Sequence, residues 1–184
     1  RGLGDVYKRQ ALGYDYVAAP ASAELLFLRH MPDSALKPYF NILRTVVLTS
    51  RHEMDPDMMV EASLKLDVHG NVEHTAAGGF GPVHALDRAL RRALTRWYPE
   101  LEQMHLIDYK VRVLSPTRTN IPDAAEENGT GSNVRVLIES SDGVATWTTV
   151  GVSYNIIEAS LEALADAVTY KLYKTEQARW RAEC

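Results

Sequence analysis

Apolar and polar side chains alternate strictly over residues 61–68, which read EASLKLDV. A period of two is typical of a β-strand with one buried face, so we expect Ala62, Leu64, Leu66 and Val68 to lie in a core. The other segments with a strand pattern are residues 41–50, 72–77, 107–115, 133–140 and 144–153.

Two longer segments repeat their apolar residues every three to four positions, as amphipathic helices do. The first runs from about Pro82 to Trp97, with its proline in the first turn, where proline is tolerated. The second covers residues 154–174, and a shorter helix is expected at residues 20–30. The two apolar stripes are Val83, Leu86, Leu90, Leu94 and Trp97 in the first helix, and Ile157, Leu161, Leu164, Val168 and Leu172 in the second.

These elements occur twice in the same order, three strands followed by a helix. Hairpin turns are expected at residues 69–71 and 141–143, before the third strand of each set. The two halves align with Gly70 on Gly143, Gly78 on Gly151 and His74 on Trp147. The sequence therefore predicts an α+β fold of two pseudo-symmetric βββα units, each an antiparallel sheet with a helix on one face, preceded by a short helical segment.

The chain is expected to divide into a few segments around this repeat. Residues 1–10 lack periodicity, so we expect them to be non-native or disordered, whereas residues 11–37 form an accessory helical segment. The repeat occupies residues 38–175, and residues 176–184 are expected to be a tail. Between the halves, residues 115–132 are rich in Pro, Gly, Asn and Thr, which predicts a mobile surface loop, either a tolerated insertion or a functional lid.

Composition narrows the possible partners. The 184 residues are 46% hydrophobic, which is enough for a core, and the formal net charge is −4. A mildly acidic chain argues against nucleic acid or an anionic membrane as partner. Apolar runs are too short to span a bilayer and no secretory signal is visible. The one cysteine, Cys184, excludes a disulfide framework, so we expect a cytoplasmic protein.

The glycine-rich stretch at residues 78–82 invites a nucleotide-binding interpretation. Gly79 and Gly81 match two positions of the G-x-G-x-x-G fingerprint, but His84 occupies the third, and the preceding strand is a half-polar hairpin strand. We therefore disfavour a nucleotide. The free N–H groups of a helix N-terminus suit a carboxylate as well as a phosphate. The second helix start offers Ser153 or Asn155 as a cap, and we expect the two helix starts to face a small ligand.

No catalytic arrangement emerges from the remaining polar residues. The six histidines are not spaced as metal ligands, and the adjacent Glu126 and Glu127 lie in the predicted loop. We therefore expect no catalytic residue, no metal and no cofactor in this chain, which is more typical of a binding or assembly module. Four arginines on the polar side of the first long helix suit either an anion site or, as we favour, a solvated face. They are Arg88, Arg91, Arg92 and Arg96.

Three stretches resemble a known family: EHTAAGGFGPVHALDRALRRAL, LIDYKVRVL and TVGVSYNIIEASLEALADAVTYKL. They are similar to the C-terminal regulatory domain of the 2-isopropylmalate synthase and citramalate synthase family, over residues 13–174. The wording of DYKVRVL and VGVSYNIIEAS is nearer the citramalate branch. The resemblance implies an acyltransferase parent whose TIM barrel, with acetyl-CoA and a divalent metal, condenses acetyl-CoA with a 2-oxo acid. That acid is pyruvate in the citramalate branch, which serves isoleucine biosynthesis.

The resemblance further implies that this domain forms a homodimer and binds an end-product amino acid for feedback inhibition. The effector is isoleucine in the citramalate branch and leucine in the isopropylmalate branch. We expect backbone N–H groups near Gly81 and Asn155 to bind its carboxylate. A structural dimerisation module without effector, and a nucleotide-binding enzyme, are the alternatives. The effector-binding residues implied by the matching motifs are Ala76, Ala77, Gly79, Gly81, Pro82, Asp108, Tyr109, Asn155, Ile156, Ile157 and Ala159.

Overall fold

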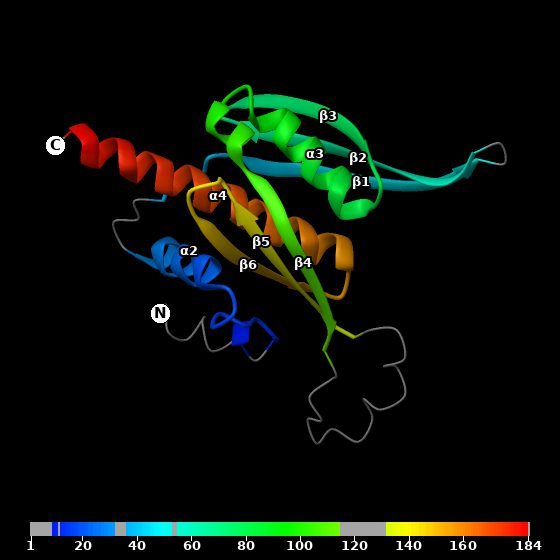
Figure 1. The fold of residues 1–184 in the computed structure, drawn as a ribbon, viewed down its shortest axis with the longest axis horizontal. Helices are drawn as coiled ribbons and strands as arrows, with labels where there is room; N and C mark the ends of the chain where they lie inside the picture. The colour runs from blue at the N-terminus through cyan, green and yellow to red at the C-terminus, as the bar shows by residue number, and fades with distance from the viewer. Residues whose placement is uncertain (1–8, 11, 32–35, 53–54, 115–131, 184) are drawn as a thin grey trace, which may run out of the picture. The chain divides into compact units, whose positions relative to one another are not determined.

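The computed structural model describes residues 9–10, 12–31, 36–52, 55–114 and 132–183 (Figure 1). Residues 115–131 of the loop expected at 115–132 lie outside this part of the chain, as do residues 1–8 and Cys184. The elements, in chain order, are α2 (Pro20–His30), β1 (Asn41–His52), β2 (Asp55–Val68), β3 (Asn71–Gly79), α3 (Pro82–Leu94), the 3-10 helix η1 (Pro99–Gln103), β4 (His105–Val113), β5 (Val134–Ser141), β6 (Thr146–Ser153) and α4 (Ile156–Glu183). None of the described helices is long and apolar enough to cross a membrane.

The chain divides into two compact units, and each contains one of the predicted repeats. Unit 1 consists of residues 1–35 and 105–170, and unit 2 of residues 36–104 and 171–184. Each unit holds a three-stranded antiparallel sheet, in the order β4-β5-β6 in unit 1 and β1-β2-β3 in unit 2. The predicted α+β fold with duplicated βββα units is confirmed. The end of α4 belongs to unit 2, although its first half covers the sheet of unit 1.

In unit 2, α3 packs on one face of its sheet (Figure 1). The strict alternation in β2 has the predicted result, because Ala62, Leu64, Leu66 and Val68 are each fully buried. The hydroxyl of Thr75 donates to the carbonyl oxygen of Ala89 at 2.9 Å, which fixes β3 against the helix. Burying a side chain as large as leucine contributes about 1.5–3 kcal/mol, so this face is the main source of stability in the unit.

Unit 1 repeats this packing with other residues. The hydroxyl of Thr149 donates to the carbonyl oxygen of Ala163 at 2.8 Å, and the indole of Trp147 donates to the carbonyl oxygen of Ala167 at 3.1 Å. Small residues allow the close approach of helix and sheet. Gly151 lies in β6, and an added Cβ there would lie 2.0 Å from the carbonyl oxygen of Ala159.

The two threonine contacts give the correct alignment of the repeats. Thr75 and Ala89 in unit 2 correspond to Thr149 and Ala163 in unit 1, an offset of 74 residues for both strand and helix. The strand pairs Ala62 with Ala77 and Val136 with Gly151 follow the same offset. The predicted matches of Gly78 with Gly151 and of His74 with Trp147 are therefore wrong by one position.

The hairpins explain why the sequence misleads here. In unit 2, His69 and Gly70 both have positive φ (52° and 83°), as a two-residue type I′ turn requires. In unit 1 only Gly143 has positive φ (82°), the pattern of a type II′ turn in which glycine comes first. Relative to the strand register, the glycine therefore lies one position earlier in the turn of unit 1 than in the turn of unit 2, and aligning glycine on glycine shifts the two strands by one residue.

Some element boundaries differ from those expected. Strand β2 begins at Asp55, before the alternating segment at residues 61–68, and α3 ends at Leu94 rather than near Trp97. Pro99 follows and opens η1, which explains the early end. Helix α4 continues to Glu183, well past the last residue of its apolar stripe, so the segment expected as a tail is helical.

Candidate functional site

Strand β3 runs into α3 with almost no space between them. Gly79 is the last residue of the strand, and an added Cβ would lie 2.5 Å from the backbone nitrogen of Ala85. Glycine is therefore required at this position by the close approach of strand and helix. Pro82 follows in the first turn of α3, as expected from its fixed φ and missing N–H.

Gly81 caps α3 under different conditions. Its φ of −163° is an extended conformation that any residue adopts, and an added Cβ would meet no atom within 4 Å. The fold itself does not require glycine there. No side chain caps this helix start, so the N–H groups of Val83 and His84 have no side-chain acceptor. Free N–H groups at a helix start can bind an anionic group.

The start of α4 is more self-contained. The side-chain oxygen of Asn155 accepts a hydrogen bond from the N–H of Ile157 at 2.8 Å, which confirms Asn155 as the cap. The N–H of Asn155 in turn donates to the hydroxyl of Ser153 at 3.1 Å. Two backbone donors near Asn155 are thus already used, and the two helix starts are not equivalent in what they offer a ligand.

Tyr109 of β4 lies against the first turns of α4. Its hydroxyl is 3.0 Å from the hydroxyl of Ser160, which donates to the carbonyl oxygen of Ile156 at 2.6 Å. The structure therefore brings together three predicted site residues of unit 1, Tyr109, Ile156 and the fully buried Ala159. Ile156 is itself 42% exposed.

Asp108 is engaged by its neighbours. Its carboxylate lies 2.6 Å from the ammonium of Lys110 and accepts the N–H of Tyr109 at 2.8 Å. The hydrogen bond from Lys110 and then that from Tyr109 hold the pKa of Asp108 below its usual value, so it remains an anion. An ammonium group of a ligand would have to compete with Lys110 for this carboxylate.

The two predicted alanines of unit 2 lie at a pocket. Ala76 and Ala77 are in β3 and line a surface pocket of about 480 Å³, whose other walls include residues of α3 and η1. The predicted site residues thus form two groups, Ala76 to Pro82 in unit 2 and Asp108 to Ala159 in unit 1.

An exposed aromatic side chain precedes each of the two helices, and the sequence analysis missed both. Phe80 is 96% exposed before α3, and Tyr154 is 73% exposed before α4. They are 74 positions apart and therefore occupy the same place in the repeat. Phe80 stacks on His84 with ring centroids 5.5 Å apart. The correct repeat offset would have paired the two aromatics from the sequence alone. Single exposed apolar side chains are common on protein surfaces, but these two recur at the same place in both repeats, which makes them candidates for a contact surface.

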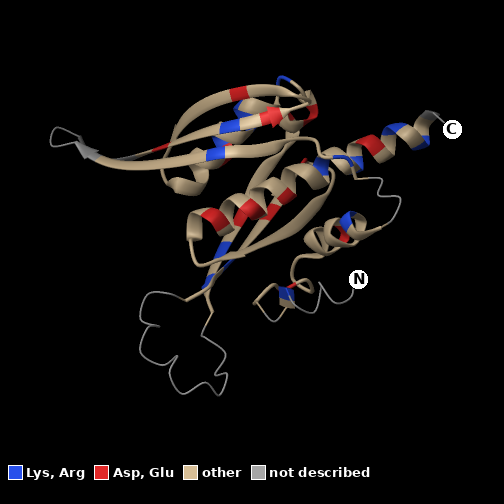
Figure 2. Cartoon of the chain, turned by 180° about the vertical axis from the view of Figure 1, so that it is seen from behind, with Lys and Arg blue, Asp and Glu red and all other residues tan. Residues whose placement is uncertain are grey.

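A second feature that the sequence analysis missed is a row of acidic residues on α4. Glu158, Glu162 and Asp166 follow one another at intervals of four, so they share one side of the helix. Figure 2 shows acidic residues along the first half of this helix and basic ones nearer its C-terminal end. Their spacing was visible in the sequence, whereas their partners were not.

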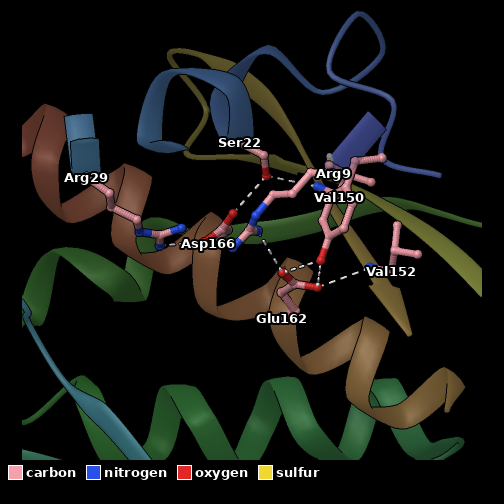
Figure 3. A network of polar contacts seen from close by, with 8 residues as sticks. Arg9, Ser22, Arg29, Val150, Val152, Glu162 and Asp166 are labelled. Atoms are coloured by element: carbon pink, nitrogen blue, oxygen red, sulfur yellow. Dashed lines mark hydrogen bonds and ion pairs between the residues drawn. The ribbon is translucent and has the colours of Figure 1, made fainter. Parts of the chain in front are cut away.

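Glu162 and Asp166 bind groups from the edge of the sheet and from the N-terminal segment (Figure 3). Glu162 accepts the N–H of Val152 at 3.1 Å and the hydroxyl of Tyr14 at 2.7 Å. Asp166 accepts the hydroxyl of Ser22 at 2.9 Å, and that hydroxyl accepts the N–H of Val150 at 3.0 Å.

These contacts satisfy the outward N–H groups of Val150 and Val152 in edge strand β6, which would otherwise be open to another strand. The guanidinium of Arg29 completes the cluster at 2.7 Å from Asp166. Burial raises the pKa of Glu162, against the opposing effect of the hydrogen bonds from Tyr14 and Val152.

The described histidines each have separate surroundings. His74 contacts Ser63, His69 contacts Tyr98 and His84 accepts the N–H of Phe80. No group of three His, Cys, Asp or Glu residues that would suit a metal ion occurs within the described ranges.

Comparisons with known proteins agree with the sequence motifs. A family model described as the LeuA allosteric (dimerisation) domain matches residues 18–172. The chain is 48% identical over 165 residues to an (R)-citramalate synthase of Aquifex aeolicus, covering 90% of this chain and 29% of the relative. It is 42% identical over 175 residues to that of Geobacter sulfurreducens, covering 95% and 31%. A 2-isopropylmalate synthase of Aquifex aeolicus is 30% identical over 137 residues, covering 74% and 23%. The chain thus spans less than a third of the length of these relatives.

Proposed function

The chain belongs to the family of LeuA allosteric (dimerisation) domains, and from that premise we propose that it regulates a citramalate synthase-like acyltransferase. The parent enzyme would condense acetyl-CoA with pyruvate to form citramalate, on the way to isoleucine. That chemistry, with its divalent metal and acetyl-CoA site, belongs to a barrel domain outside these residues. The higher identity to (R)-citramalate synthases than to a 2-isopropylmalate synthase supports this branch.

The chain's own role is to form a homodimer and bind the end-product amino acid. A ligand inhibits a distant site only through different affinities for two states of the protein, and an interface between subunits offers such states. The repeated exposed aromatics, Phe80 and Tyr154, are the observation that carries this proposal. Each lies directly before a helix start, so the same apolar contact surface recurs in both repeats.

The uncapped start of α3 suits the effector carboxylate better than the start of α4 does. Its N–H groups lack a side-chain cap, and an added Cβ at Gly81 would meet no atom within 4 Å. At α4, Asn155 already occupies the N–H of Ile157, so the exposed Ile156 there would contact the apolar side chain instead. This assignment follows from which donors each helix start still offers.

Calorimetry and sedimentation on the 184-residue chain test the proposal. We expect a dimer that binds isoleucine more tightly than leucine or valine. Tighter binding of leucine would assign the chain to the isopropylmalate branch, the second candidate. A dimer that binds none of the three would be a structural dimerisation module, and a monomer without binding would overturn the proposal altogether.

A pair of substitutions distinguishes a specific role of Phe80 from a general effect of exposed apolar side chains. Phe80→Ser removes an exposed side chain, so it should leave the fold intact while weakening isoleucine binding or dimerisation about tenfold, the loss expected when an anchor residue is truncated. Phe27→Ser on α2 is the matched control, because Phe27 is also exposed (66%) but has no counterpart in the repeat. Equal effects of the two substitutions would contradict the role of Phe80.

A further inference from the structure

The arginines on the polar side of α3 are mostly exposed, as a solvated face requires, and three of them also line a pocket. Arg88, Arg91 and Arg92 all line the pocket of about 480 Å³ in unit 2, which lies along β3 and is bounded on another side by η1. Arg96, the fourth arginine of the region, is not part of the lining and pairs loosely with Glu73 at 4.0 Å. Three of four basic side chains therefore converge on one concave surface.

The three guanidinium groups differ in how their charge is used. Arg91 forms an ion pair with the buried Asp87 and donates to the carbonyl oxygen of Met104, so its charge is compensated within the fold. Arg88 donates to the carbonyl oxygen of Gly78 at 2.8 Å, and Arg92 to that of Ala76 at 3.4 Å. These last two contact neutral oxygens. Since a guanidinium carries five N–H donors, both keep donors and charge for another group.

The backbone of β3 adds donors on the same side. Strand β3 is at the edge of its sheet, and the carbonyl groups of Ala76 and Gly78 point outward to the arginines. In an antiparallel strand the N–H of a residue points to the same side as its carbonyl, so two N–H groups also face outward here. Gly78 is not required by packing, because an added Cβ would meet nothing nearer than a contact of 3.8 Å.

We propose that this pocket of unit 2 binds a small anion through Arg88, Arg92 and the outward N–H groups of Ala76 and Gly78. Residues four apart on a helix place their Cβ atoms about 5–6 Å from each other, which suits one phosphate or the two carboxylates of a short dicarboxylic acid. Ala76 and Ala77, which the family motifs imply as effector-binding, belong to this pocket, whereas the helix start at Gly81 and Pro82 does not. We assign the pocket a role of its own, distinct from binding of the amino-acid effector.

Two carboxylates on the lining refine the class of ligand. Glu61 and Glu102 also line the pocket and are exposed. They repel a bare anion and accept hydrogen bonds, so the preferred ligand carries a hydroxyl group beside its anionic group. A hydroxylated dicarboxylate or a phosphorylated hydroxy compound satisfies both sides.

The test is an NMR titration of the full chain with inorganic phosphate, succinate and malate, at constant ionic strength. We expect saturable shifts of the Ala76 and Gly78 amides, with malate binding more tightly than succinate because of its hydroxyl. Saturation by phosphate alone would assign the site to phosphoryl groups, and saturation by the dicarboxylates alone would assign it to carboxylates. Linear shifts without saturation for all three would overturn the proposal.

Charge variants make the result specific. Arg88→Gln and Arg92→Gln should each weaken phosphate binding about tenfold, the effect of losing one charge-assisted hydrogen bond. Arg96→Gln changes the net charge equally and should leave binding unchanged. Glu102→Gln should tighten phosphate binding about two- to fivefold, because it removes a repulsive charge.

Tighter phosphate binding by Glu102→Gln cannot arise from misfolding, which would weaken binding. Equal effects of all three arginine variants, or weaker binding to Glu102→Gln, would overturn the site. Isoleucine and leucine should not displace phosphate, whereas displacement would show that this is the effector site and overturn its separate role. These competition results do not depend on whether either amino acid inhibits a parent enzyme.

Discussion

Gly151 is confined by the backbone of α4, so its missing side chain is a requirement of the fold. An added Cβ would lie 2.0 Å from the carbonyl oxygen of Ala159 and 2.9 Å from its carbonyl carbon, and neither backbone atom can rotate away. Gly151→Ala should lower the free energy of unfolding by about 1–3 kcal/mol, the usual cost of overpacking, as measured by urea denaturation.

Gly78→Ala is the control for this substitution. Its nearest backbone atom would be 3.8 Å from the new Cβ, an ordinary contact, so we expect a change within about 0.5 kcal/mol. The two glycines were aligned with each other in the sequence, and the structure gives them different roles. Equal losses at both positions would contradict the close approach of β6 and α4.

Glu162 should make stability depend on pH in an unusual direction for a carboxylate. Burial raises its folded-state pKa above the unfolded value, so the neutral form is favoured in the fold. Its contribution is fully present below the unfolded pKa and is lost as pH rises through the folded pKa. Glu162→Gln removes this titration while keeping an oxygen for the N–H of Val152.

The variant should therefore gain stability relative to the parent chain between pH 4 and pH 7, as measured by urea denaturation across that range. Glu158→Gln serves as the comparison. In the parent chain the carboxylate of Glu158 accepts a hydrogen bond from the hydroxyl of Ser153 at an exposed site. A relative stability of Glu162→Gln that falls with rising pH would contradict the effect of burial.

Part of the candidate site could be predicted from residue types alone. Asn155 was expected as a cap and is one, because the residue preference for that position is local. The partners of Glu162 come from Tyr14 and Val152, and contacts at such sequence separation carry no periodic signal. The choice of effector residues from the family motifs remains a prediction.

Helix α2 is fixed to unit 1 by polar contacts as well as by apolar packing. Ser22 is 3% exposed and joins the N–H of Val150 to the carboxylate of Asp166. Ser22→Ala leaves that N–H without a partner, which should cost about 1–3 kcal/mol of unfolding free energy. Hydrogen exchange at the Val150 amide should accelerate at the same time.

Ser63→Ala provides the matched control on a strand of unit 2. The hydroxyl of Ser63 contacts His74 on an exposed surface, so we expect a loss within about 0.5 kcal/mol and no change at Val150. If Ser63→Ala lowers the free energy of unfolding as much as Ser22→Ala does, the hydrogen bond between Ser22 and Val150 makes no particular contribution to stability.

The elements themselves were largely predictable because their patterns are local. Alternation in β2 and the apolar stripe of α3 follow directly from one buried face. The end of α4 was not predictable in this way. Residues 175–183 contain neither glycine nor proline to stop a helix, although the apolar stripe ends before them. A missing stop signal is weaker evidence than a repeated apolar residue.

The duplicated architecture followed from the sequence, but its division into units did not. Three strands and a helix recur in order, and this order alone predicts two βββα units. The structural units are discontinuous, because unit 1 combines residues 1–35 with 105–170 and unit 2 takes the end of α4. Which segments join which unit depends on long-range packing. The periodicity of apolar residues along the chain carries no information about such packing.

Helix α4 has a consequence for how the polypeptide acquires its structure during synthesis. Its first part supplies Ala163 and Ala167 to unit 1, and its last part supplies Leu172 and Tyr173 to unit 2. The sheet of unit 1 lacks its helix until α4 has been translated, whereas α3 covers the sheet of unit 2 much earlier in synthesis. The nascent chain therefore exposes the sheet of unit 1 for longer than that of unit 2, which delays the folding of unit 1.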